Sequence, residues 1–319
     1  MATFWTQLLP LRQADIMTVK LSRSPLGVLP RDHWQRAVTE LDPAVDYERI
    51  TRISTAYEFP WDTAMSLSLA LFRTFAVPSI GGLLHETGEF TTRPQRRYDD
   101  TTLILDAIGQ HGMASPRGRA AIRRMNQMHR SYAISNDDLA YVASTFVVVP
   151  TRWNARYGWR RLLPSEIDAA VAYWDELGRR MGIRDLPTTY AGFERLMDGY
   201  ERAHFRFDPR CRAVADATLD LATTFYPSVS RRATRSVVLA LLDEPLLDAL
   251  GYARPSPRVR AAAEGALRLR ARVVRRLPPR RRPFRAERLR WVRSYPHGYA
   301  IEQLGTFPSG CPTSPRVPT

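Results

Sequence analysis

The chain has 319 residues, 44% of them hydrophobic, which is enough to bury a large core as one big domain or two modest ones. Its formal net charge is +15. The two cysteines, Cys211 and Cys311, lie far apart in the sequence, which excludes a disulfide framework and a thiolate metal site and predicts a reducing compartment.

The N-terminus lacks the basic region and long apolar core of a signal peptide. No apolar run approaches the roughly 18–20 residues that a membrane span needs. The sequence therefore predicts a cytoplasmic protein that is neither secreted nor membrane-spanning, with peripheral membrane binding left open. Residues 1–60 have a mixed pattern, with a helical patch at "RDHWQRAVTELD", and are predicted to form a helical N-terminal extension.

From Trp61 onward, apolar residues recur at helical spacing. The glycines in "PSIGGLLHETGEF" predict a short or broken helix and a loop. The next helix is expected to end at Gly112, and the one after it to begin with Ser115 as N-cap. A further helix is predicted to stop at Pro150, and another to start with Ser165 as its cap.

Helical patterns continue through "TTYAGFERLMDGYERAHF" and "DPRCRAVADATLDLATTFY", and period-two strand patterns are nearly absent. The sequence therefore predicts an all-α fold, with one large helical domain at residues 61–253. Residues 254–308 are predicted to be a basic C-terminal segment that packs on this domain, and residues 309–319 a disordered tail.

The net positive charge is concentrated in the C-terminal segment. Residues 254–293 contain 15 arginines and only two acids, Glu264 and Glu287, so the rest of the chain is nearly neutral. Within this stretch, a helix is predicted with arginines on one side and apolar residues on the other: Val259, Ala263, Ala266, Leu267, Val273, Val274 and Leu277.

Three interpretations of residues 254–293 remain open. The segment could lie on an anionic membrane surface, bind nucleic acid, or pack on the domain by its apolar side while its arginines are solvated. Nucleic-acid binding is the least favoured of the three, because no nucleic-acid-binding motif is present.

The sequence lacks several common catalytic motifs. None of its six histidines pairs with another at a spacing of three or four, and neither HExxH nor CxxC occurs, so a zinc site is not supported. A P-loop, a dinucleotide-binding glycine motif and a GxSxG elbow are also missing. ATP hydrolysis, nicotinamide chemistry and serine hydrolysis therefore lack their usual residues.

His129 lies among apolar residues in "MNQMHRSYAI", with Met125, Met128 and Tyr132 at helical spacings around it. A single imidazole can serve as the proximal ligand of a haem iron, because the porphyrin supplies four other ligands. The alternative is a packed or hydrogen-bonded core histidine. From these residues alone the core histidine is favoured.

Arg97 and Thr101 are four residues apart and share one helical face. An arginine and a hydroxyl that project together into a pocket could donate hydrogen bonds to bound dioxygen. The alternative is the first turn of a helix, in which Asp99 and Asp100 interact favourably with the helix dipole and Arg97 is solvated.

Several segments, in this order, resemble the MpaB-type oxygenase family, which includes the bacterial latex-clearing rubber oxygenases: "FAVPSIGGLLHETGEF", "RPQRRYDDT", "RMNQMHRSYAISNDDLAYV", "TRWNARYGWR", "WDELGRRMGI" and "YPHGYAIEQLGTFP". The resemblance runs from about Trp61 to about Pro308. It implies a globin-like helical fold that encloses non-covalent haem b and uses dioxygen as co-substrate. It also implies His129 as the proximal iron ligand, with Met125, Met128 and Tyr132 packed around the haem.

The resemblance also assigns the distal side of the haem. Arg97 and Thr101 match an arginine and a threonine of the rubber oxygenases, and Glu89 or Glu86 would serve as a distal base. One position departs from the family pattern, because Asp100 stands where the rubber oxygenases carry a lysine that can cap the iron. A carboxylate cannot reproduce a neutral amine ligand.

The function that the resemblance implies is haem-dependent oxidation or cleavage of a C=C bond in a hydrophobic, isoprenoid-type substrate. Polyisoprene itself is disfavoured, because rubber is extracellular and no export signal is visible. The alternative is a helical protein that binds a lipid or another ligand in a degenerate pocket and catalyses nothing. Asp100 in place of lysine keeps that alternative open.

Overall fold

The computed structural model describes residues 29–225, 231–289 and 292–306. No β-strand occurs within these ranges, which confirms the all-α prediction. The α-helices are α1 (His33–Thr39), α2 (Tyr47–Ile53), α3 (Pro60–Phe75), α4 (Pro78–Glu86), α5 (Glu89–Thr92), α6 (Pro94–His111), α7 (Pro116–Arg130), α8 (Asn136–Tyr157), α9 (Pro164–Met181), α10 (Tyr190–His204), α11 (Pro209–Thr223), α12 (Arg231–Leu241), α13 (Glu244–Ala249) and α14 (Pro257–Arg276).

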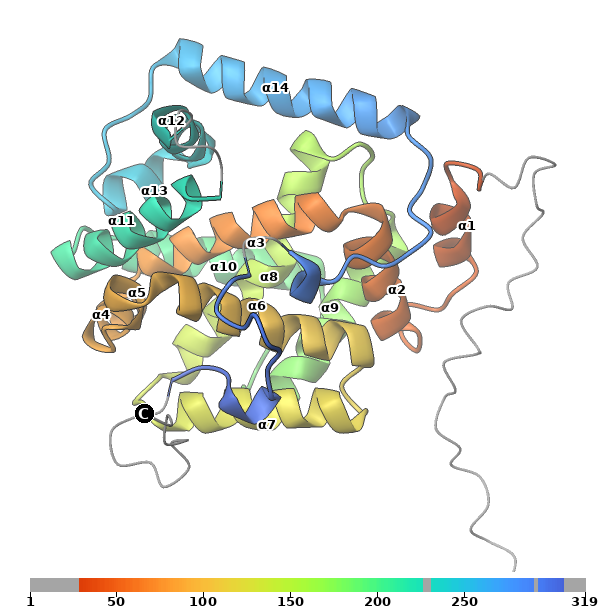
Figure 1. Cartoon of the computed structure of the whole chain (residues 1–319), viewed down its shortest axis with the longest axis horizontal. Coiled ribbons are helices and arrows are strands. Elements are labelled where there is room, and N and C mark those ends of the chain that lie inside the picture. Colours follow the sequence, from red (N-terminus) through yellow and green to blue (C-terminus); the bar gives the residue numbers. More distant parts are fainter. Residues whose placement is uncertain (1–28, 226–230, 290–291, 307–319) are drawn as a thin grey trace, which may run out of the picture.

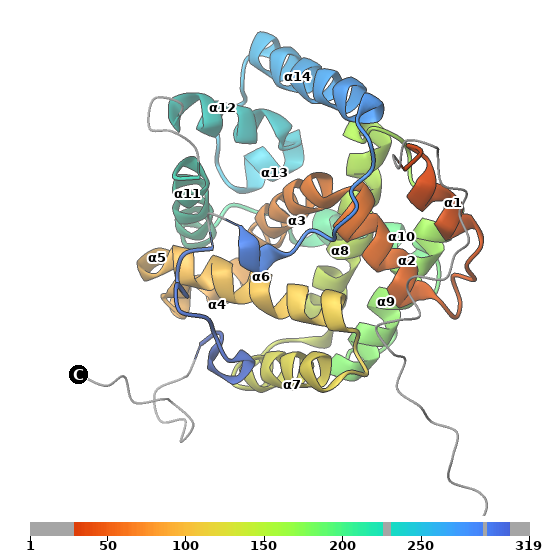
Figure 2. The same ribbon diagram turned by 45° about the vertical axis from the view of Figure 1, so that its right-hand side comes forward.

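The helices pack around α3, α6 and α8. Helix α3 packs on α8, α6 on α7, α2 on α9, and α10 on the other side of α8. Helices α11, α12 and α13 form one end of the molecule, and α14 lies at its edge (Figures 1 and 2). Among the described residues no single helix is long and apolar enough to cross a membrane. Helices α3 and α4 together meet those criteria, across a bend of 95°.

Helix boundaries around α6 and α7 follow local sequence signals. Gly112 ends α6 with φ of +81°, a conformation that glycine adopts without strain. The Ser115 hydroxyl accepts a 2.9 Å hydrogen bond from the Gly118 backbone N–H at the start of α7, with Pro116 as the first helical residue. Both predicted boundaries are confirmed.

Two predicted boundaries are wrong. Helix α8 continues through Pro150 to Tyr157, although proline cannot donate the backbone hydrogen bond at that position. Packing against α3, α9 and α10 holds this central helix together despite the lost bond. Helix α9 begins at Pro164, so its N-cap is Leu163 and not Ser165. The Glu166 carboxylate accepts a 2.8 Å hydrogen bond from the Leu163 backbone N–H.

After α14 the chain returns across α6 to α7, as Figure 1 shows. Within the described residues this C-terminal segment is irregular apart from the short 3₁₀ turns Ala286–Arg288 and Ile301–Gln303. Its side chains enter the core, where Leu304 is fully buried. The Arg124 guanidinium of α7 donates to the Leu304 carbonyl at 2.6 Å. The predicted tail at residues 309–319 lies outside the described residues.

The apolar side predicted for α14 is only partly covered by the rest of the protein. Ala263 is buried and Leu267 and Val274 are half-buried, whereas Val273 and Leu277 are 52% and 51% exposed. At 3.6 residues per turn the predicted apolar residues do share one arc of the helix surface. Because α14 packs mainly on α12 and α8, part of this arc faces solvent.

A buried ion pair fastens α14 to α3. Asp62 is 1% exposed and accepts hydrogen bonds from the Arg270 guanidinium at 3.0–3.2 Å and from the Trp153 indole N–H at 3.0 Å. Burial raises the pKa of Asp62, while the charge of Arg270 opposes that shift. The guanidinium also lies 3.7 Å from the centroid of the Trp61 ring. Removing Arg270 would leave a buried carboxylate with one side-chain hydrogen-bond donor and no opposite charge.

We expect Arg270→Met to lower the free energy of unfolding by about 3 kcal/mol, because it unpairs the buried Asp62. The matched control is Arg268→Met on the same helix, whose exposed guanidinium pairs with Glu264. That change should cost at most about 0.5 kcal/mol. Urea unfolding measures both, and a loss for Arg270→Met no larger than that of the control would contradict the assigned role.

Candidate active site

A cavity of about 760 Å³ lies within the helical body, lined by residues of α2, α3, α6, α7, α8 and α9. This volume is within the range of sites for small molecules and cofactors. Its walls are mainly aliphatic and aromatic. They include Ala64, Leu67 and Leu71 of α3, Ile104 and Leu105 of α6, Val142, Phe146 and Val147 of α8, and Tyr173 and Trp174 of α9.

His129, in the last turn of α7, lines this cavity. Its Nδ1 atom is buried and has no hydrogen-bond partner. Burial, together with the charge of Arg97, lowers the pKa of His129 to about 4. The imidazole is therefore neutral near pH 7, the form that binds metals. His129 therefore lacks the hydrogen bond at Nδ1 that a fully satisfied core histidine would make.

The neighbours of His129 that were predicted from helical spacing surround it in the cavity wall. Met125, Met128 and Tyr132 all line the same space. Met128 also packs closely against Gly305 of the C-terminal segment, where a Cβ atom would collide with the methionine sulfur. Gly305 has φ of +82°, so glycine both permits this backbone conformation and leaves room for Met128.

Arg97 and Thr101 lie near the start of α6 and line the same cavity as His129. The Arg97 guanidinium donates a hydrogen bond to the Thr101 hydroxyl, which donates in turn to the Arg97 carbonyl at 3.0 Å. The guanidinium lies 5.3 Å from the centre of the Phe90 ring. Burial lowers the pKa of Arg97, against the opposing charges of Asp100 and Glu89. A cationic donor is thus held at an apolar cavity.

Asp100 does not line the cavity. It is 3% exposed and accepts a hydrogen bond from the Tyr295 hydroxyl. Burial is the main cause of its raised pKa. The adjacent Asp99 accepts a 2.7 Å hydrogen bond from the Ser294 hydroxyl. Both acids therefore hold the C-terminal segment against α6, and neither faces His129.

The two predicted candidates for a distal base also lie outside the cavity lining. Glu89 forms an ion pair with Arg93, four residues away. Glu86 has a side chain that is 60% exposed and pairs with Arg210 at 2.7 Å. Of these two acids, Glu89 interacts electrostatically with Arg97, because its negative charge raises the pKa of that arginine.

Sequence reasoning missed the polar part of the cavity wall. Ser54 belongs to the π-helix Ser54–Glu58, which follows α2, and donates a 2.6 Å hydrogen bond to Glu166 of α9. Asn154, one turn after Pro150, has a buried Oδ1 atom without a partner. The sequence had assigned Ser54 to an N-terminal extension, yet Ser54, Glu166 and Asn154 all line the cavity. A π-helix is a recurrent feature of functional sites, but it was not evident from local periodicity.

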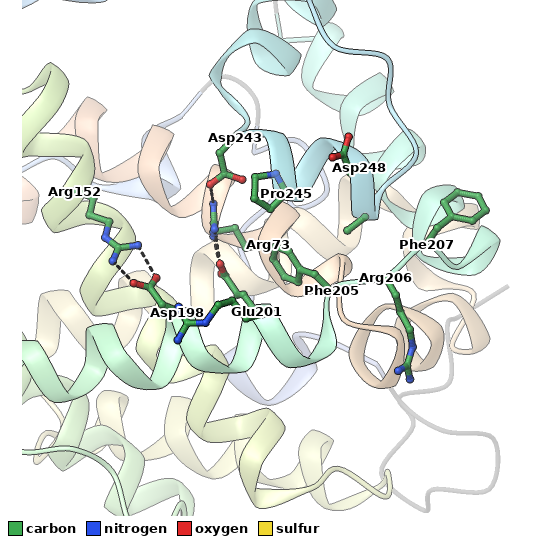
Figure 3. Close-up of a pocket in the computed structure, with 12 residues that line it drawn as sticks. Arg73, Arg152, Asp198, Glu201, Phe205, Arg206, Phe207, Asp243, Pro245 and Asp248 are labelled. Carbon is green, nitrogen blue, oxygen red and sulfur yellow. Dashed lines mark hydrogen bonds and ion pairs between the residues drawn. The ribbon is translucent and has the colours of Figure 1, made fainter.

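A second pocket, of about 560 Å³, opens on the surface between α10 and α13 (Figure 3). Several of its charged side chains form pairs: Arg73 bridges Glu201 and Asp243, and Arg152 binds Asp198. Figure 3 shows these side chains directed toward one another. The pairs join α3, α8, α10 and the start of α13, so the arrangement serves packing.

Residues 59–276 match the family model described as "ER-bound oxygenase mpaB/B'/Rubber oxygenase, catalytic domain". The chain belongs to this family. The family resemblance noted in the sequence is therefore confirmed. The matched range starts just before α3 and ends at the last residue of α14, so it includes the walls of the cavity formed by α3, α6, α7, α8 and α9.

Curated members of the family align over part of their length. The chain is 30% identical over 246 residues to ER-bound oxygenase mpaB' of Penicillium brevicompactum, covering 70% of this chain and 57% of that protein. It is 32% identical over 192 residues to ER-bound oxygenase mpaB of the same organism, covering 53% and 48%. For mpaB of Penicillium roqueforti the identity is 31% over 154 residues, covering 46% and 51%. The match thus spans about half the length of these relatives.

Asp106 gives the cavity a group that titrates in a measurable range. Burial is the main cause that raises the pKa of Asp106 to about 6, and hydrogen bonds from Gln110 and the Ala286 backbone oppose the shift. An unfolded aspartate has a pKa of about 3.9. The folded state therefore binds the proton more tightly. The stabilisation that comes from this tighter proton binding is fully present below about pH 4. It is lost as the pH rises through about 6.

We expect Asp106→Asn to raise the free energy of unfolding by about 1–2 kcal/mol at pH near 7.5, where the native carboxyl is charged. Near pH 4, where that carboxyl is protonated, we expect no increase. Urea unfolding at the two pH values measures the difference. Asp168→Asn on α9, an exposed site, is the control and should change stability equally at both. If Asp106→Asn raised the free energy of unfolding equally at both pH values, Asp106 would not have the raised pKa assigned to it.

Proposed function

We propose that this chain is a haem-dependent oxygenase that acts on a hydrophobic substrate. The observation that carries the proposal is the neutral imidazole of His129, without a partner at Nδ1, in the wall of an apolar cavity that Arg97 also lines. Membership of an oxygenase family supports the reaction class.

The residues around His129 fit haem b. A single imidazole suffices as the protein ligand, and thioether and aromatic side chains such as Met125, Met128 and Tyr132 suit the faces of an apolar macrocycle. The cavity volume of about 760 Å³ leaves room for substrate next to the cofactor. When bound, the haem supplies the iron redox chemistry, and the protein supplies orientation and polarity.

In this proposal Arg97 and Thr101 are the polar partners of dioxygen. The contacts of Arg97 with Thr101 and Phe90 hold its guanidinium in place before any ligand binds. In an apolar, water-poor cavity a fixed cationic donor stabilises developing negative charge more strongly than in water. Asp100, Glu89 and Glu86 take no direct part, because none of them lines the cavity.

For the substrate we propose an isoprenoid-type chain that is cleaved or oxidised at a C=C bond. The cavity borders α6 from Arg97 to Gln110, which corresponds to about 20 Å at a rise of 1.5 Å per residue. A long space with aliphatic walls suits an extended hydrocarbon chain. The family description, which includes rubber oxygenase, points to the same class of compound.

We expect His129→Ala to lose most of its bound haem, because the iron loses its only protein ligand. The unmodified protein, supplied with haem, should show a Soret band and about one haem per chain. His111→Ala, at an exposed site on α6, is the matched control and should keep its haem. Stoichiometric haem with an unchanged spectrum in a folded His129→Ala would show that the ligand assignment is wrong.

Arg97→Met tests the distal side, because methionine keeps the length of the side chain and removes the donors. We expect haem to be retained and oxygen uptake with a prenylated substrate to fall by about a hundredfold. Arg96→Met, at the neighbouring exposed position, is the control. Unchanged uptake in Arg97→Met would remove Arg97 from the reaction. An unmodified protein that holds haem but consumes no oxygen would favour the ligand-binding alternative.

A further inference from the structure

Helix α14 exposes an unusual share of apolar surface. Within the described residues seven large hydrophobic side chains are exposed, and four of them belong to α14 or its C-terminal end: Val259 (37%), Leu269 (59%), Val273 (52%) and Leu277 (51%). Figures 1 and 2 show α14 at the edge of the molecule, with its outer side away from the other helices.

The exposed apolar side chains form a line along the helix. Leu269, Val273 and Leu277 follow one another at intervals of four, so they lie on one face. Ala262 and Ala266, which are also exposed, continue this face toward the start of α14. We call these five residues the outer apolar line.

Arginines flank the outer apolar line. Arg258, Arg272 and Arg276 are exposed, lie next to the line on the helix surface and have no acidic partner among the described residues. Arg268, on the same flank, pairs with Glu264 at 3.2 Å. The surface therefore combines an apolar stripe with uncompensated positive charge.

The orientation of this surface is fixed by the neighbouring, buried side of α14. Arg270 points inward to the buried Asp62, and Ala263 is buried. The outer apolar line therefore cannot rotate into the protein to be covered without breaking that ion pair.

Three kinds of partner could cover the outer apolar line. Nucleic acid would use the arginines but would leave the leucine and valine side chains exposed. A second copy of the chain would place these arginines against one another in a symmetric contact. An anionic bilayer uses both features, since apolar side chains enter the boundary between headgroups and acyl chains while arginines contact lipid phosphates.

We propose that α14 lies flat on an anionic membrane surface, with the outer apolar line inserted and Arg258, Arg272 and Arg276 in contact with lipid headgroups. The short apolar stripe implies reversible, peripheral binding. The interaction depends on the charge of the lipid and weakens as salt concentration rises.

The test is co-sedimentation of the full chain with vesicles. Vesicles of phosphatidylcholine that contain phosphatidylserine should bind the protein, and vesicles of phosphatidylcholine alone should bind it much more weakly. Leu269→Asp/Val273→Asp should weaken binding to the anionic vesicles by more than about tenfold. Arg272→Gln/Arg276→Gln should weaken it by about fivefold for each arginine removed.

Matched controls change the same residue types elsewhere on the surface. Val45→Asp, at a side chain that is 75% exposed, and Arg195→Gln on α10 should leave vesicle binding unchanged. Circular dichroism and thermal unfolding confirm that each variant is folded. Equal vesicle binding by Leu269→Asp/Val273→Asp and Val45→Asp would overturn the proposal.

Two further outcomes would assign the surface to another partner and also overturn the membrane proposal. One is loss of duplex DNA binding in Arg272→Gln/Arg276→Gln with vesicle binding unchanged. The other is a dimer in the unmodified protein that becomes monomeric in Leu269→Asp/Val273→Asp, again with vesicle binding unchanged.

Discussion

The structure depends on a large apolar cavity that its own side chains do not fill. An unfilled apolar cavity destabilises a fold because its lining atoms lose packing partners, and a volume of about 760 Å³ is large. Water is a poor filler for aliphatic and aromatic walls. A tightly bound hydrophobic ligand would therefore stabilise the folded chain as well as equip it chemically. Among the α7 residues that line the cavity, His129 is the one with a neutral nitrogen base.

Buried acids hold the cavity walls together across long stretches of sequence. Asp62 joins α3 to α14, and Asp100 joins α6 to Tyr295 of the C-terminal segment. Glu166 joins α9 to the π-helix through Ser54. Each acid is almost completely buried, so each would be costly without its distant partner. Polar contacts thus fix the positions of the walls, while most of the cavity lining is apolar.

Local signals were sufficient to predict the helices around α6 and α7, because a glycine with positive φ and a serine cap act within a few residues. They failed where tertiary packing overrides a local preference. Pro150 is held inside α8 by three neighbouring helices, and Asp100, which the family resemblance placed at the distal side, turns toward a segment almost two hundred residues later. The partnership of His129 with Arg97 and Thr101 was predicted from the resemblance, whereas Ser54 and Asn154 could not be predicted, since the contacts that bring them to the cavity are long-range.

Helical periodicity indicates that one face of a helix is apolar. It does not indicate whether that face packs against protein, lines a cavity or contacts solvent. The stripe around His129 and the stripe of α14 have the same kind of spacing, and both are typical of core-facing helices. In the structure the first borders a cavity and the second borders solvent. The polar groups beside the two stripes differ. Beside the first stripe lies a buried nitrogen without a hydrogen-bond partner, and beside the second lie exposed arginines without an acidic partner among the described residues. Polar groups without a protein partner therefore distinguish these two apolar surfaces, which the apolar pattern alone does not.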